Sequence, residues 1–195
     1  GRTQEIVYSL NRMISEGELP PMPVYVDSPL AINATEIFRK YPHYLDDETH
    51  EFVRTGKHPA LTFPSLSYTH SVEESKAINY SETPSVIIAA SGMCEAGRIL
   101  HHLVHNIEDE RNTICIVSWQ APHTLGRRLV EKQPIVKIFG EEVPLKAEVA
   151  TINGLSAHAG QDMLVKYAAS TANEHLKEIY LVHGDAEAAA ALLEK

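Results

Sequence analysis

Apolar positions follow a helical period in some segments of the chain and form short uninterrupted runs in others. The spacing of Ile6, Val7, Leu10, Met13 and Ile14 matches one face of an amphipathic helix and predicts a helix over residues 3–16. The uninterrupted runs predict buried strands, which are Val24–Val26, Ser85–Ala90, Thr113–Val117, Ile135–Ile138, Leu145–Ile152 and Ile179–Val182. Further helices are predicted over residues 31–41, 72–79, 96–107, 124–131, 161–170 and from 185 onward.

This alternation of helices with wholly apolar strands favours a doubly wound α/β fold, in which helices cover both faces of a mainly parallel sheet. In such sheets, ligands bind beyond the carboxyl ends of the strands. The candidate functional loops are therefore those that follow Val26, Ala90, Val117, Ile152 and Val182.

Composition narrows the class of protein. The 195 residues carry 17 Lys and Arg against 26 Asp and Glu, a net charge of −9. This balance argues against a protein that coats nucleic acid through a broad basic face, but not against a nuclease that contacts phosphates locally. No apolar run approaches the roughly 18 residues of a membrane span, so no membrane partner is expected. The chain starts without Met and stops inside a predicted helix, so we expect a piece of a longer protein.

Two cysteines cannot form a disulfide framework, and a reduced, cytoplasmic setting is expected. Cys115 lies within a predicted buried strand and should be inert, whereas Cys94 could be exposed.

The loop after Ala90 reads Ser91-Gly92-Met93-Cys94-Glu95-Ala96-Gly97-Arg98 and leads into a predicted helix. Backbone N–H groups at a helix N-terminus favour an anion, and Arg98 could add a forked phosphate contact. A tight strand-to-helix turn that requires Gly92 for its conformation is an equally good interpretation.

Histidines at three places in the sequence are candidates for chemistry. His101 and His105 lie four residues apart on one predicted helix, as metal-binding pairs often do, with His102 between them. No third ligand has suitable spacing there, so hydrogen-bonding or surface histidines are favoured over a zinc site. His158 and His183 lie in consecutive candidate loops, where a proton donor and a metal ligand could be placed, although single histidines at such positions are usually structural.

Asp27-Ser28-Pro29 follows the first predicted strand. A helix cap by Ser28 or Asp27, with Pro29 in the first turn, is favoured there over a direct substrate role.

Taken together, these loops resemble one known family. The chain is similar to the β-CASP region, with its C-terminal extension, of metallo-β-lactamase-fold ribonucleases, a group that includes the nuclease subunit of the polyadenylation cleavage factor and its bacterial and archaeal relatives. The matching segments are Gly1-Arg2-Thr3-Gln4-Glu5, Val24-Tyr25-Val26-Asp27-Ser28-Pro29-Leu30-Ala31, Ser91-Gly92-Met93 with Gly97-Arg98 and His101-His102, Gln120 with Thr124-Leu125-Gly126-Arg127, Ser156-Ala157-His158-Ala159, and Leu181-Val182-His183-Gly184-Asp185.

The resemblance implies a fold, a substrate and site residues. Residues 1–148 would form the β-CASP domain, and 149–195 would be the C-terminal part of a metallo-β-lactamase αββα domain. His158 would donate a proton or contact a phosphate, and His183 would be a zinc ligand of the kind found in RNA-processing members. The candidate substrate contacts are Ser91, Gly92, Met93, Arg98, Ser156 and Ala157.

The family's main metal cluster, His-x-His-x-Asp-His, does not occur in this sequence. One remaining ligand cannot hold the two zinc ions that the resemblance implies, so these residues alone should be inactive, while the full-length protein would hydrolyse RNA. The resemblance also implies that the protein can form a homodimer.

Two alternatives stay open. The first is a non-catalytic RNA-binding or scaffold paralogue of the same family, although such proteins often lose the histidine motifs that are intact here. The second is an unrelated phosphate-binding α/β module, which predicts an anion at Ser91–Met93 and no functional link between His158 and His183.

Overall fold

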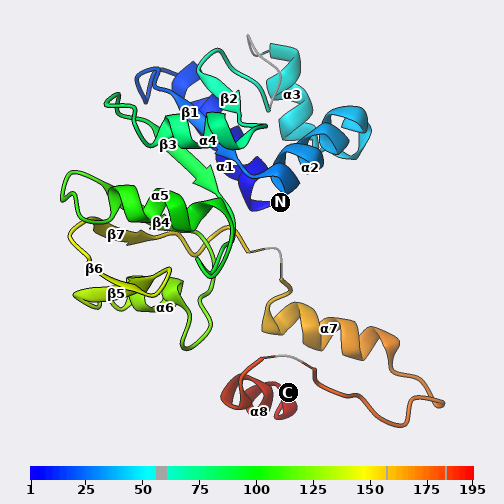
Figure 1. Ribbon diagram of the computed structural model, residues 1–195. Coiled ribbons are helices and arrows are strands. Elements are labelled where there is room, and N and C mark those ends of the chain that lie inside the picture. Colours follow the sequence, from blue (N-terminus) through cyan, green and yellow to red (C-terminus); the bar gives the residue numbers. More distant parts are fainter. Residues whose placement is uncertain (56–60, 157, 183) are drawn as a thin grey trace. The chain divides into compact units, whose positions relative to one another are not determined.

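The computed structural model describes residues 1–55, 61–156, 158–182 and 184–195 (Figure 1). The chain divides into two compact units, Gly1–Leu155 and Ser156–Lys195.

The first unit contains a three-stranded parallel sheet in the order β2-β1-β3. Its strands are β1 (Val24–Asp27), β2 (Leu66–Tyr68) and β3 (Val86–Ala89). Val24 and Val26 point to one face and share a core with Val7 of α1 (Arg2–Ser15) and Ile32 of α2 (Pro29–Lys40).

Because side chains alternate along a strand, Asp27 should point to the opposite face. There it contacts Ser75 of α4 (Val72–Ile78) and Arg98 of α5 (Arg98–Asn106). The 3-10 helix η1 (Pro42–Tyr44) and helix α3 (Asp47–Thr55) precede β2. Helices thus cover both faces of a parallel sheet, and the predicted α/β fold class is confirmed.

A second, separate core lies in the same unit, around a two-stranded parallel sheet. β4 (Thr113–Ile116) pairs with β7 (Glu148–Thr151), and α5 and α6 (Leu125–Val130) pack on these strands. The largest fully buried side chains of this core are Ile107, Leu129, Ile138 and Val136. The parallel strands are therefore divided between two sheets and do not form one continuous sheet.

An antiparallel hairpin completes this core. β5 (Ile135–Ile138) pairs with β6 (Glu141–Pro144) across Gly140, whose φ of +88° is in the left-handed region that glycine tolerates. The apolar pattern did not predict β6, because its sequence Glu-Glu-Val-Pro holds only one apolar strand former. Pairing with β5 is what makes this segment a strand.

The burial of the two cysteines is the reverse of the expectation. Cys94 is buried, whereas Cys115 is exposed, because β4 belongs to a two-stranded sheet and presents Thr113 and Cys115 on its open face. Burial raises the pKa of the Cys94 thiol to about 11, which keeps it protonated and unreactive near neutral pH.

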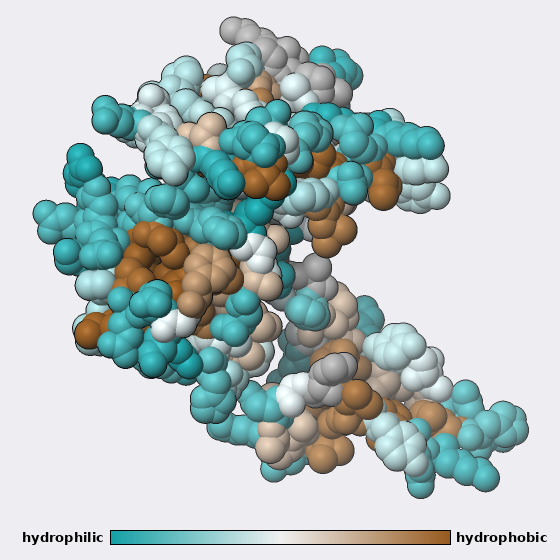
Figure 2. Space-filling view, in the orientation of Figure 1, coloured by the Kyte–Doolittle hydropathy of each residue, from teal (hydrophilic) through white to brown (hydrophobic). Residues whose placement is uncertain are grey.

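The second unit consists of two helices, α7 (Gln161–Thr171) and α8 (Ala186–Leu193), neither of which has a buried residue. Apolar side chains such as Met163, Tyr167 and Leu193 lie at its surface, and Figure 2 shows brown patches over this part of the chain. The predicted strand at Ile179–Val182 is not formed. The backbone there pairs with no other described strand, and a strand needs such a partner.

Among the described helices, none combines the length and the apolar character needed to cross a lipid bilayer.

Candidate functional site

The loop from Ser91 to Arg98 joins β3 to α5 and is closed by its own backbone. The Ser91 N–H donates to the Ala96 carbonyl (3.0 Å), and the Cys94 N–H donates to the Ser91 carbonyl (3.1 Å). Gly92 and Met93 are exposed at its tip.

Gly97, and not Gly92, is the glycine that this turn requires. Its φ is +84°, and an added Cβ would lie 2.5 Å from the Ala90 carbonyl oxygen. Gly92 has no such constraint on φ, although a Cβ there would approach the Ser118 hydroxyl to 3.1 Å.

A second loop, between β4 and α6, braces the tip of the first. The Ser118 hydroxyl (3.1 Å) and the Gln120 amide nitrogen (2.8 Å) both donate to the Gly92 carbonyl. The Gly126 N–H donates to the Met93 carbonyl (3.0 Å). Sequence reasoning singled out Gln120 and Gly126 as motif residues but missed Ser118, for which the sequence contains no signal.

Glu95 makes a further link between the two loops. Its carboxylate accepts a hydrogen bond from the Leu125 N–H at the start of α6. Exposed backbone at Gly92 and Met93 is thus held in one conformation from both sides, which is the condition for backbone groups to serve as a preformed binding surface.

Gly126 is required for this bracing, so we expect Gly126→Ala to destabilise the protein. A Cβ at residue 126 would lie 1.7 Å from the Gln120 side-chain oxygen and 3.0 Å from the Met93 carbonyl oxygen. Overpacking of this kind costs about 1–3 kcal/mol of unfolding free energy, measurable by urea denaturation. The matched control is Gly154→Ala, where a Cβ meets nothing within 4 Å. Equal stability of the two variants would contradict the packing argument.

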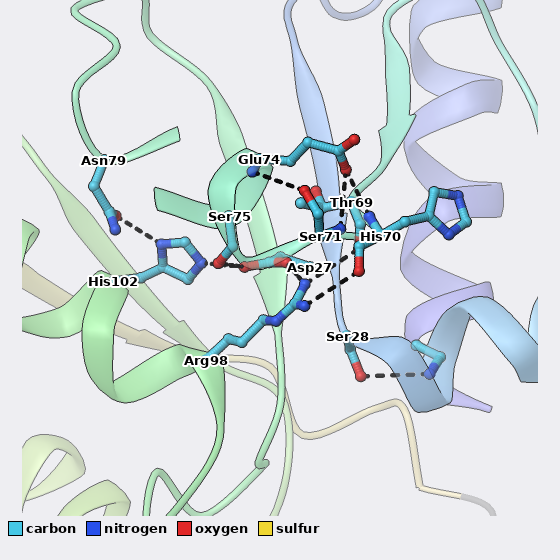
Figure 3. A network of polar contacts seen from close by, with 11 residues as sticks. Asp27, Ser28, Thr69, His70, Ser71, Glu74, Ser75, Asn79, Arg98 and His102 are labelled. Carbon is cyan, nitrogen blue, oxygen red and sulfur yellow. Dashed lines mark hydrogen bonds and ion pairs between the residues drawn. The ribbon is translucent and has the colours of Figure 1, made fainter. Parts of the chain in front are cut away.

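Asp27 is the centre of a buried polar network at the carboxyl end of β1 (Figure 3). Its carboxylate accepts hydrogen bonds from the Ser75 hydroxyl (2.6 Å) and from Nε2 of His102 (2.7 Å), and it forms an ion pair with Arg98. Burial by itself would raise the pKa of the Asp27 carboxyl. The hydrogen bonds from Ser75, His102 and Arg98 together outweigh burial and hold its pKa below the ordinary value.

Arg98 therefore points into the protein. One guanidinium nitrogen also donates to the Thr69 carbonyl (3.2 Å), and only 19% of the side chain is exposed. The ion pair of Arg98 with Asp27 joins the start of α5 to the end of β1. A contact of Arg98 with phosphate stays a prediction.

The three histidines of α5 have separate environments. The buried His102 also places Nδ1 2.7 Å from the Asn79 side-chain oxygen, so both of its ring nitrogens have partners. The rings of His101 and Phe139 lie 4.9 Å apart, and those of His105 and Tyr80 lie 5.8 Å apart.

Ser28 is the N-cap of α2, as predicted. Its hydroxyl accepts a hydrogen bond from the Ala31 N–H (3.4 Å), and Pro29 occupies the first turn.

Ser156 and His158, in the second unit, contact each other. The His158 N–H donates to the Ser156 hydroxyl oxygen (3.3 Å), and that oxygen lies 3.2 Å from His158 Nδ1. Both side chains are exposed. Ala157 and His183, the other candidates in this unit, lie outside the described residues. Two residues after His183 in the sequence, Asp185 caps α8 by accepting a hydrogen bond from the Ala188 N–H (2.8 Å).

Two family models match parts of this chain. Residues 3–129 match the model of the Beta-Casp domain. The chain belongs to the β-CASP family. Residues 142–195 match the model described as the Zn-dependent metallo-hydrolase RNA specificity domain. The resemblance found in the sequence motifs is thereby confirmed.

Individual relatives agree with this membership. The chain is 38% identical to a ribonuclease of Thermus thermophilus, over 98% of the chain and 42% of the relative. It is 33% identical to the transcription termination factor FttA of Methanocaldococcus jannaschii, over 95% of the chain and 30% of the relative. An RNase J-like protein of the same archaeon is 29% identical over 86% of the chain and 37% of the relative. The chain thus spans less than half the length of these relatives.

Proposed function

We propose that this chain is the RNA-binding β-CASP portion of a zinc-dependent RNA-processing nuclease, which hydrolyses phosphodiester bonds as a full-length protein. The observation that carries the proposal is the succession of a Beta-Casp domain and a metallo-hydrolase RNA specificity domain in one chain. Relatives named as a ribonuclease and as a transcription termination factor support a substrate or partner made of RNA.

In this proposal the exposed tip of the first loop contacts the RNA backbone. Gly92 and Met93 would offer backbone groups to phosphate or ribose, and Ser91 would add its hydroxyl. The bracing by Ser118 and Gln120 supports this role, because a preformed surface loses little conformational entropy on binding.

His158 would donate a proton or contact the scissile phosphate, with Ser156 and Ala157 beside it. The hydrogen bonds of Ser156 favour that role. As a proton donor, His158 would carry a proton on both ring nitrogens. The Ser156 hydroxyl oxygen has two lone pairs, so it can accept from the His158 N–H and also from Nδ1–H of that imidazolium, which leaves the Nε2 proton to be donated.

The described residues do not fit a zinc site by themselves. Within the ranges 1–55, 61–156, 158–182 and 184–195, no group of three or more His, Cys, Asp or Glu side chains could hold a metal ion. His183 is proposed as a single zinc ligand, with the remaining ligands of two ions outside this chain. The chain alone is therefore proposed to be inactive.

Zinc removal tests the proposal directly. The full-length protein is expected to cleave single-stranded RNA with zinc, to lose all measurable cleavage after dialysis against a chelator, and to recover when zinc is restored. The matched control is the 195-residue chain with zinc, which should not cleave. A zinc-loaded full-length protein that bound RNA without cutting it would support the alternative of a non-catalytic RNA-binding paralogue.

Other features remain part of the proposal. They are a β-CASP domain over residues 1–148, the C-terminal part of a metallo-β-lactamase domain over 149–195, a cytoplasmic location and a homodimer.

A further inference from the structure

Trp119 is exposed in the loop between β4 and α6, the loop that braces Gly92 and Met93. It is the only tryptophan of the chain, and 65% of it is accessible to solvent. Exposure alone does not mark a site, since Tyr44, Tyr80 and Tyr180 are more exposed. Trp119 is singled out because both of its neighbours in the chain bond to the Gly92 carbonyl at the tip of the first loop.

The backbone of Trp119 is held on both sides. Its neighbours Ser118 and Gln120 both bond to the Gly92 carbonyl, and the Gln120 amide nitrogen also lies 3.2 Å from the Trp119 carbonyl oxygen. The Gln120 side chain that makes two of these bonds is buried, whereas the Ser118 bond lies at the surface. The backbone at Trp119 is therefore tied to the tip of the Ser91–Met93 loop, and the indole is left exposed.

We infer that the Trp119 indole stacks on a nucleobase of single-stranded RNA whose backbone follows the Ser91–Met93 loop. The inference rests on the proposed function and deepens it. Stacking suits an RNA-processing protein because every base has a π-face, so an aromatic platform binds strands of any sequence.

The negative net charge of the chain also favours binding through base stacking. With a net charge of −9, the chain offers little long-range attraction to phosphates, so affinity must come from short-range contacts. The residues that flank Trp119 in the chain are the half-buried, polar Ser118 and the buried Gln120, so neither adds the contiguous apolar area that an apolar protein interface needs.

The fluorescence of the single tryptophan makes the contact measurable. The 195-residue chain is titrated with an oligoadenylate of about eight nucleotides, and separately with an abasic ribose-phosphate oligomer of equal length and charge. The oligoadenylate is expected to quench the fluorescence and to bind at least about 5-fold more tightly than the abasic oligomer, which should leave the fluorescence unchanged.

Variants connect the affinity to the indole. Trp119→Ala is expected to weaken oligoadenylate binding by about 5- to 100-fold, measured by anisotropy of a labelled oligomer, with little effect on the abasic oligomer. Trp119→Phe should retain part of the affinity, because a smaller ring still stacks. The matched control is Tyr44→Ala, which removes an 82% exposed aromatic of η1 and should leave binding unchanged.

Three results would overturn the inference: unchanged oligoadenylate affinity in Trp119→Ala, equal quenching by the abasic oligomer, or no binding of either oligomer. Quenching that depends on protein concentration and not on RNA would also overturn it, since it would show that another protein surface covers the indole. None of these results touches the zinc-dependent cleavage by the full-length protein, which tests the proposed function separately.

Discussion

Replacing His158 by alanine in the full-length protein is expected to slow RNA cleavage by about 10²- to 10⁴-fold, the usual contribution of a positioned proton donor. The zinc content should stay unchanged, because in the proposal His158 acts on the substrate and not on the metal. Single-turnover cleavage rates and metal analysis of the same preparations measure both quantities. Ser156→Ala should cause a smaller loss of rate, since it removes the hydroxyl that lies 3.2 Å from His158 Nδ1.

His183→Ala separates the two proposed roles. We expect this variant to lose zinc as well as activity, because a metal ligand is removed. The matched control is His175→Ala, which changes a highly exposed histidine of the same unit and should preserve both zinc and rate. Equal zinc loss in the His158 and His183 variants would contradict the assignment.

Asp27→Ala is expected to lower the free energy of unfolding by about 3–5 kcal/mol, because it leaves the Arg98 guanidinium without its carboxylate in a largely buried site. It also removes the hydrogen-bond partner of the buried His102. Chemical denaturation of the chain measures the effect. The double variant Asp27→Ala/Arg98→Met should be less destabilised than Asp27→Ala, because no uncompensated charge remains.

The matched control for Asp27→Ala is Asp109→Ala. Asp109 pairs with Arg111 on the surface, where an ion pair contributes little to stability. Similar unfolding free energies for the two single variants would show that the network around Asp27 does not stabilise the fold.

Asp27 should also shape the acid unfolding of the protein. Its folded-state pKa lies below the ordinary value of 3.8, so its contribution to stability is complete well above that pH. The contribution is lost as the pH falls below 3.8 through the folded-state pKa. The unfolding free energy of the wild-type chain should therefore fall more steeply in this range than that of Asp27→Asn.

Local features of this protein could be predicted from the sequence alone. The helix at Arg2–Ser15 and an N-cap within Asp27-Ser28-Pro29 are both present as expected. Each depends on residues within about four positions of one another, whose spacing is visible in the sequence. The family could be recognised from the sequence for the same reason, since each of its motifs is a short segment.

Contacts between distant segments could not be predicted. Asp27 and Arg98 are 71 positions apart, and only the packing of α5 against the end of β1 makes them partners. A phosphate contact was inferred for Arg98 because its position at the start of a helix is visible in the local sequence. Its actual partner, Asp27, is distant in the sequence and leaves no local signal. The burial of Cys94 and the exposure of Cys115 likewise depend on the two-stranded sheet of β4 and β7, which no local pattern specifies.

The sequence by itself thus determined the order of most helices and strands, their caps and the β-CASP membership of this protein. The tertiary structure alone decided that Asp27, Ser75, Arg98 and His102 form one buried network, and that Ser118 and Gln120 hold the tip of the Ser91–Met93 loop. The physical reason is the distance along the sequence over which each effect acts. Periodicity and capping act over a few residues, whereas partner choice in a core follows from which elements pack together.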